Sequence, residues 1–376
     1  MPTRKSEYTI PIHPIIRNPR ECDGYPSVYI RQEPAHEVNF YIEECKDKPN
    51  NKLLCELQCN RKKGATRQQQ LACSLIISSS STISTNSSDN YEEGPEISST
   101  NSKDVVHDHD HDHADTIQKQ QLLLSELDKS KPVIIICHGL LSWRNQMLIA
   151  NLASQLSSEL SWHTLRFDFT ASGHSSGTWK FADYQGDYRD LYQVARFVKE
   201  ELGCRIGCII GHSQGAAAVI KYANEHEHEH EHDNDGGGCC YVNLAGRFTV
   251  PNDYKPEAVF TEEQCKDLKE NGKFTLLRKG ASGDRSLEVT AEDVENRILY
   301  DISSAVHGLD EHGIKMLTIH GDQDKQVPVE NAYKFDAVIP NHSLHIVKGA
   351  DHNFNGLRFM DDIVSSIASF VIRIQS

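Results

Sequence analysis

A serine between two glycines is the clearest chemical signal in the chain, because residues 211–215 read Gly-His-Ser-Gln-Gly. The apolar run before them (205–210) is typical of a buried strand, and the alanine-rich run after them (216–223) is typical of a helix packed on a sheet. A sharp turn between such a strand and helix exposes the serine hydroxyl and points backbone N–H groups at it. The pattern therefore predicts that Ser213 is a nucleophile. The alternative is a glycine-rich turn with an idle serine.

Two later strand ends carry the side chains that a serine nucleophile needs. The strand-like run 315–321 is followed by Asp322 and Asp324, and the run 343–347 is followed by a loop with His352. An imidazole can take the proton of a serine hydroxyl, and a carboxylate can fix the imidazole's tautomer and stabilise its charged form. We therefore predict His352 as the general base and one of the two aspartates as its partner. Position alone leaves both aspartates open.

The backbone around the predicted serine offers a site for a developing negative charge. The most strand-like run of the chain opens into a His-Gly-Leu turn at 138–140. The small residue in this turn lets a backbone N–H face the site, so we expect the N–H groups of Leu140 and Gln214 to stabilise an oxyanion. We interpret His138 as a turn residue that hydrogen-bonds the loop, because His352 is better placed to act as the base.

Length and charge limit the classes of protein that the chain can represent. Its 376 residues suffice for one large α/β domain with extra segments, and its net charge of -15 argues against nucleic acid as a partner. No apolar run approaches the roughly 20 residues of a membrane-spanning helix, and the N-terminus lacks the apolar segment of a secretory signal. The 11 cysteines are an odd number, which fits a reducing compartment. We therefore predict a cytoplasmic protein without a transmembrane segment.

Composition divides the chain into an extension and one catalytic domain. Residues 1–50 contain several prolines and no clear periodicity, which predicts a loosely ordered N-terminal extension. Residues 51–376 are predicted to form the catalytic domain, interrupted by polar low-complexity stretches at 78–116 and 225–238. Such stretches hold too few apolar residues to bury a core, so we predict that both are disordered.

The rest of the pattern alternates strands with helices. The apolar runs 52–57 and 71–77 predict an antiparallel hairpin at the start of a sheet. Apolar residues at helical spacing predict helices at 145–160, 184–202 and 360–372. Strands that alternate with such helices imply an α/β fold, in which a mostly parallel sheet is flanked by helices.

A long segment at about 247–314 exceeds an ordinary crossover between strands. It contains helix-like runs at 261–271 and 290–300, each opened by a threonine with acidic residues in the first turn. Such an insertion is expected over the carboxyl ends of the strands, and so over Ser213. We predict a helical cap that shapes the substrate pocket. The alternative is a surface lobe away from the site.

Two tracts, at 107–113 and 225–232, alternate histidine with acidic residues. Imidazole and carboxylate groups bind zinc, nickel or copper, so a weak metal site is chemically possible. Strict alternation in a flexible segment fixes no ligand geometry, however, and two such tracts suggest the expansion of a short genetic repeat. We therefore predict no functional metal and no cofactor.

Several short motifs between residue 131 and the end match one family. They are His-Gly at 138–139, Arg-Phe-Asp-Phe at 166–169, Gly173 with Ser175 and Gly177, the pentapeptide at 211–215, Asn-Leu-Ala-Gly-Arg-Phe at 243–248, and the stretches 320–328 and 339–352. With them the region resembles the α/β-hydrolase superfamily, most of all its esterase/lipase and serine-aminopeptidase-like branch. The resemblance implies the α/β-hydrolase fold, whose triad follows the order Ser, Asp, His along the chain.

The resemblance also chooses between the two aspartates. In such families the acid is the aspartate of a Gly-x-x-Asp-x-x-Val-Pro pattern, and that position here is Asp324 rather than Asp322. The sequence departs from the family at 170–171, where Thr-Ala replaces the usual basic-glycine pair. That departure puts the geometry of the loop in doubt, but it removes no member of the predicted triad.

These expectations describe a serine hydrolase that cleaves a carboxylic ester or thioester through an acyl-enzyme intermediate. The substrate would be a small-molecule or lipid acyl ester, and no protein partner is indicated. A peptidase or an acyltransferase could use the same triad. Two other classes stay open: a non-catalytic ligand-binding protein of this fold, and an interaction protein that acts through its N-terminal extension. The intact Ser213, Asp324 and His352 disfavour the first of these.

Overall fold

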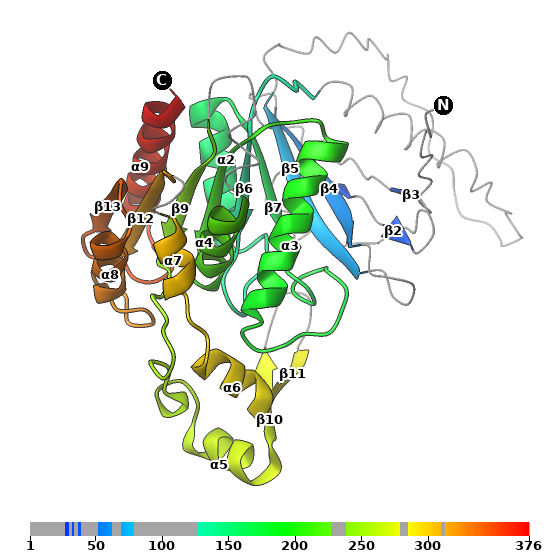
Figure 1. Ribbon diagram of the computed structural model, residues 1–376. Coiled ribbons are helices and arrows are strands. Elements are labelled where there is room, and N and C mark those ends of the chain that lie inside the picture. The colour runs from blue at the N-terminus through cyan, green and yellow to red at the C-terminus, as the bar shows by residue number, and fades with distance from the viewer. Residues whose placement is uncertain are drawn as a thin grey trace, which may run out of the picture.

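A nine-stranded sheet forms the centre of the described structure (Figure 1), in the order β1-β4-β5-β7-β6-β8-β9-β12-β13. The computed structural model describes residues 127–226, 238–278, 285–309 and 313–375, with five strands ahead of them. The strands of the large sheet are β1 (Ser27–Tyr29), β4 (Lys52–Arg61), β5 (Gln69–Ser78), β6 (Val133–Cys137), β7 (His163–Phe167), β8 (Ile206–His212), β9 (Cys240–Leu244), β12 (Met316–Gly321) and β13 (His342–Val347). A separate antiparallel pair consists of β2 (Gln32–Glu33) and β3 (Glu37–Val38).

The strands from β7 to β13 run parallel to one another, whereas β5 is antiparallel to both β4 and β7. Every residue of β6, β8, β9 and β12 is buried. Continuous apolar runs of this kind form strands that are covered on both faces. The mostly parallel sheet expected from the sequence is therefore confirmed, and the expected hairpin is β4 with β5.

Helices cover both faces of this sheet (Figure 1). On one face, α2 (Met147–Leu160) and α9 (Leu357–Gln375) share a core with side chains of β6 and β12. The other core takes side chains from α3 (Tyr184–Arg196), α4 (Gln214–His226), α7 (Ser303–Gly308) and α8 (Glu330–Val338). The three helices predicted from apolar spacing are confirmed as α2, α9, and α3 with its π-helical continuation η2 (Phe197–Glu201).

The insertion between β9 and β12 holds η4 (Pro256–Ala258), α5 (Glu262–Asn271), β10 (Lys273–Arg278), β11 (Arg285–Thr290) and α6 (Ala291–Ile298). Both expected helices are present, and Thr261 and Thr290 form capping boxes at their N-termini. The antiparallel pairing of β10 with β11 was not expected. The insertion packs on the segment that follows β7, where the rings of Tyr184 and Tyr300 stack with their centroids 3.8 Å apart.

Most of the predicted extension and low-complexity sequence lies outside the described residues. Within 1–50, β1 joins the sheet beside β4. Of the stretch 78–116, only the last residue of β5 is described. The helix α4 continues through Glu225 and His226, so it includes the first two residues of the stretch 225–238, and residues 227–237 are outside the description.

Candidate active site

The turn between β8 and α4 presents Ser213 in a strained conformation. Its φ of 53° lies in the left-handed region, which is costly for a residue with a side chain. The flanking glycines permit this turn, because a Cβ on Gly211 would lie 2.4 Å from the oxygen of Gly215, and a Cβ on Gly215 would lie 2.5 Å from the oxygen of His138. The backbone N–H of Ser213 is held by the oxygen of Leu244 at 2.8 Å. Close packing of strand, turn and helix thus fixes the serine.

The structure brings Ser213, His352 and Asp324 into one hydrogen-bonded chain. His352 Nε2 lies 3.0 Å from Ser213 Oγ, and His352 Nδ1 lies 2.6 Å from Asp324 Oδ2. A carboxylate only accepts hydrogen bonds, so Nδ1 carries the ring proton and Nε2 is free to accept from the serine hydroxyl. Asp324 follows β12 and His352 follows β13, and these parallel neighbours end at the same edge of the sheet.

Several donors converge on the carboxylate of Asp324. Its Oδ1 accepts from the backbone N–H groups of Gln326 and Val327, both at 2.8 Å, and its Oδ2 lies 3.3 Å from His320 Nε2. Burial acts to raise the pKa of this carboxyl, but the hydrogen bonds from His320, His352 and the Val327 N–H hold it well below its ordinary value. Asp324 is therefore charged at neutral pH and can stabilise a protonated His352.

The other candidate acid, Asp322, has a different partner. Its Oδ1 accepts from the backbone N–H of Gly349 at 2.6 Å, which ties the loop after β12 to the loop after β13. The geometry therefore places Asp324, and not Asp322, against His352.

Two histidines beside Ser213, Asp324 and His352 were missed by the sequence reasoning. His212 is buried, and its Nε2 donates to the main-chain oxygen of His352 at 2.9 Å. His320 is also buried and donates from Nε2 to the oxygen of Val327 at 2.8 Å, which supports the loop around Asp324. Both stand at the ends of apolar strands, where a polar residue in an otherwise buried run could have signalled a structural hydrogen bond.

The His-Gly-Leu turn passes directly over the serine. A Cβ on Gly139 would lie 3.0 Å from the Cβ of Ser213, so only glycine fits there without displacement. The backbone N–H of Phe169 donates to His138 Nε2 at 3.1 Å, which leaves the ring proton on Nδ1 to donate to the Gly139 oxygen at 2.8 Å. His138 is thus engaged in holding the turn. Leu140 follows on this turn, and Gln214 is the first residue of α4.

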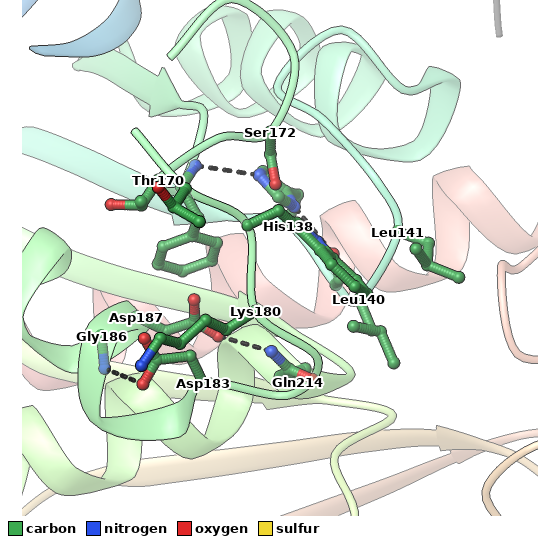
Figure 2. Close-up of a pocket in the computed structure, with 14 residues that line it drawn as sticks. His138, Leu140, Leu141, Thr170, Ser172, Lys180, Asp183, Gly186, Asp187 and Gln214 are labelled. Carbon is green, nitrogen blue, oxygen red and sulfur yellow. Dashed lines mark hydrogen bonds between the residues drawn. The ribbon is translucent and has the colours of Figure 1, made fainter. Parts of the chain in front are cut away.

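A pocket opens beside the turn (Figure 2), and both candidate oxyanion residues line it. Its lining mixes polar and apolar side chains, with Gln214 Nε2 donating to Asp187 Oδ2 at 2.6 Å across one wall. Burial raises the pKa of Asp187 well above its ordinary value. The hydrogen bond from Gln214 acts to lower this pKa, whereas the charges of two neighbouring aspartates raise it further. The lining residues are His138, Gly139, Leu140, Leu141, Phe169, Thr170, Ser172, Thr178, Trp179, Lys180, Asp183, Gly186, Asp187 and Gln214.

Hydrogen bonds hold the loop that follows β7 at residues 170–171. The backbone N–H and the hydroxyl of Thr170 donate to Asp190 Oδ2 at 2.7 and 2.6 Å. Ala171 has a φ of 56°, a left-handed value that glycine would adopt more cheaply. A buried ion pair between Arg144 and Asp168 lies at the base of the loop. Thr170 therefore anchors this loop to Asp190 of α3.

Within the residues that the structure describes, no group of three or more histidine, cysteine or acidic side chains is arranged to hold a metal ion. The tract 107–113 and residues 227–232 of the second tract lie outside those residues. The same described part contains no helix of sufficient length and apolar character to cross a membrane.

Comparisons with known proteins agree with this architecture. A family model described as alpha/beta hydrolase fold matches residues 132–231, and a search of curated proteins found no match. A protein from Agrobacterium vitis S4 described as a candidate hydrolase is similar over 85% of this chain and 99% of its own, with a TM-score of 0.51 and 15% sequence identity. At that identity the likeness shows the fold alone.

Two esterases are also among the similar structures. The Pyrococcus furiosus esterase Pf2001 aligns over 85% of this chain and 92% of its own, with a TM-score of 0.49 and 16% identity. Est1E from Butyrivibrio proteoclasticus aligns over 86% of this chain and 98% of its own, with a TM-score of 0.48 and 16% identity.

Proposed function

We propose that this chain, which has the α/β-hydrolase fold, is a serine hydrolase that cleaves carboxylic esters or thioesters through an acyl-enzyme intermediate. One observation carries the proposal: His352 Nε2 lies 3.0 Å from Ser213 Oγ while its Nδ1 lies 2.6 Å from Asp324 Oδ2. A nucleophile, a base and an acid that orients the base are then in contact before any substrate binds.

In the first half of the reaction, Ser213 Oγ attacks the carbonyl carbon of the ester while His352 Nε2 takes the hydroxyl proton. The negative charge moves to the carbonyl oxygen, where the N–H groups of Leu140 and Gln214 stabilise it. The tetrahedral species then collapses. The bond to the alcohol or thiol breaks, and His352 returns its proton to the leaving oxygen or sulfur.

In the second half, water attacks the acyl-Ser213 ester and His352 takes one proton from it. Collapse of the second tetrahedral species breaks the bond to Ser213 Oγ, and His352 protonates that oxygen. The products are a carboxylic acid and the free enzyme. The charged Asp324 stabilises the imidazolium of His352 in both halves, which fits the lowered pKa of its carboxyl.

The substrate that we propose is a small-molecule or lipid acyl ester, received in the pocket beside Leu140 and Gln214 and shaped by the insertion as a cap. An aromatic ring of the insertion supports this role. The ring centroid of Phe260 lies 5.3 Å from that of Phe181, and Phe181 is two residues from the pocket-lining Trp179. We also propose a cytoplasmic location, which fits the free cysteines of the described residues.

A panel of p-nitrophenyl esters with graded acyl length tests the reaction class and the pocket size together. The proposal expects turnover of at least one ester, abolished by Ser213→Ala. Cleavage of amide substrates at a similar rate would favour a peptidase, and formation of new esters from added alcohols in preference to hydrolysis would favour an acyltransferase. Absence of any turnover and of covalent labelling would favour a ligand-binding protein.

A further inference from the structure

An arginine of the insertion sits among three aromatic rings. The Cζ atom of Arg297, near the end of α6, lies 4.6 Å from the ring centroid of Tyr254, 5.3 Å from that of Phe181 and 5.6 Å from that of Tyr184. Aromatic ring faces attract a guanidinium charge, so these contacts account for its position in the fold. They do not provide the strong acceptors that guanidinium N–H groups require.

Hydrogen-bond donors in this cluster lack acceptors. Arg297 Nε and Nη1 are both buried and have no hydrogen-bond partner among the described residues. The hydroxyl of Tyr254 also has no hydrogen-bond partner among the described residues, and Tyr254 is only 5% exposed. Burial raises the pKa of Tyr254 to about 12, so the hydroxyl keeps its proton and can donate. Buried donors without acceptors are costly and uncommon in folded proteins.

A second guanidinium, that of Arg247, lies beside this cluster. The segment after Arg247 is joined to the end of α6, because the N–H of Asn252 donates to the Ile298 oxygen at 2.8 Å. Burial lowers the pKa of Arg247, and the charge of Arg297 lowers it further. Asp253, Tyr184 and Tyr254 act to raise the pKa of the same guanidinium. Asp253 is shared, however, because its carboxylate also lies 3.9 Å from Lys334 Nζ. The carboxylate of Asp253 is therefore divided between Arg247 and Lys334.

The cluster adjoins the triad. Arg247 Nη2 donates to the main-chain oxygen of Gln326 at 2.7 Å, and the N–H of Gln326 in turn donates to Asp324. Arg247 also lies three residues past Leu244, whose oxygen holds the N–H of Ser213. Arg297 in turn stacks on Phe181 and Tyr184, which are next in sequence to the pocket-lining Lys180 and Asp183.

We propose that Arg247, Arg297 and Tyr254 bind an oxyanion, a carboxylate or a phosphate, carried by the ester substrate away from its scissile bond. A guanidinium donates charge-assisted hydrogen bonds to such a group, and the donors left unpaired here are Nε and Nη1 of Arg297 and the Tyr254 hydroxyl. The inference rests on the proposed hydrolase activity, because it defines the substrate of that reaction as an anionic ester.

Direct binding tests the site without any turnover. Calorimetry on the full chain carrying Ser213→Ala, titrated separately with inorganic phosphate and with glutarate, should show saturable binding of at least one of them. The tighter ligand identifies the group as phosphate or carboxylate. Absence of binding by both would overturn the proposal. Covalent labelling of Ser213 in the wild type tests the hydrolase activity separately, so the two ideas can fail independently.

Substitutions locate the site. Arg297→Gln in the same background should weaken binding at least roughly tenfold, as expected for loss of a charge-assisted pair of hydrogen bonds. Arg358→Gln is the matched control, since Arg358 also stacks on a ring, that of Phe359 at 4.4 Å, but lies in α9. Equal binding by the Arg297 and Arg358 variants would overturn the assignment.

Two milder variants protect the test against loss of folding. Arg297→Lys keeps the charge on the aromatic rings but removes the planar fork, and Tyr254→Phe removes only a hydroxyl. Each should melt near the parent protein and bind the preferred anion several-fold more weakly. Unchanged affinity in both would show that the cluster is purely structural and would contradict the proposal.

Discussion

His212 Nε2 donates to the main-chain oxygen of His352 at 2.9 Å, so the residue before Ser213 holds the backbone of the proposed base. Burial, together with the charge of His352, lowers the pKa of His212 to about 3. The ring is therefore neutral at every pH at which the protein would work, and this hydrogen bond persists over that range. Ser213 and His352 are thus connected through His212 as well as through their own contact.

Replacement of His212 by phenylalanine should slow catalysis without removing a triad member. An aromatic ring is kept, but His352 loses a hydrogen bond worth roughly 1 kcal/mol, which corresponds to about a fivefold effect. We expect kcat on a p-nitrophenyl ester to fall by about that factor or more while KM changes little. A change confined to the melting temperature, with kcat unaffected, would show that His212 only supports the fold.

The two aspartates after β12 should differ sharply. Asp324→Asn should lower kcat by roughly 10³–10⁴-fold, because an amide cannot fix and stabilise the charged form of His352 as a carboxylate does. Asp322→Asn should have a small effect, since Asp322 only accepts from the Gly349 N–H and an amide oxygen can do the same. Steady-state kinetics of both variants provide the comparison. A larger loss in the Asp322 variant would assign the acid to that residue.

Asp324 should also contribute to stability in a pH-dependent way. Its folded-state pKa is lowered from the ordinary 3.8, so the folded protein binds this proton less tightly than the unfolded chain. The stabilisation is complete above about pH 4 and is lost as the pH falls through the lowered value. Melting curves of wild type and Asp324→Asn should therefore differ most near neutral pH and converge on acidification. A constant difference from pH 7 to pH 2 would contradict this.

The helix α4 ends at His226, so the first histidine of the second tract belongs to a helix. His226 Nε2 lies 2.8 Å from the Tyr188 hydroxyl, and its ring packs on those of Tyr192 and Tyr222. His226→Ala should therefore lower the melting temperature. Replacement of residues 227–237 by a Gly/Ser linker should leave ester turnover within a few-fold, and EDTA should not change the rate. Loss of activity to EDTA, restored by zinc, would reveal a metal role for the tracts.

The sheet, its flanking helices and the meeting of Ser213, Asp324 and His352 could be predicted from the sequence for a common reason. Continuous apolar runs predict buried parallel strands, and side chains just past the ends of such strands gather at one edge. The motif around Ser213 and the loops with Asp324 and His352 are each local patterns. Their meeting follows from the order of the strands, with no further information about side-chain packing.

The supporting residues could not be found in this way. His212 and His320 hydrogen-bond main-chain oxygens, and a main-chain partner leaves no trace in residue type. Arg247, Tyr254 and Arg297 come from different parts of the insertion and form no motif, because only the folded insertion brings them together. The pairing of β10 with β11 was also not predicted, although the connection 279–284 contains two glycines and a Ser-Gly pair, which are typical of turns.

Covalent labelling tests the central claim most directly. A fluorophosphonate probe reacts with a serine whose hydroxyl is activated and whose oxyanion is stabilised, so it requires the whole arrangement around Ser213. The wild-type protein should take up one probe molecule, located by mass spectrometry on the peptide that contains Ser213, and Ser213→Ala should take up none. Labelling of the alanine variant to the same extent, or an unlabelled wild type, would contradict the assignment of Ser213 as the nucleophile.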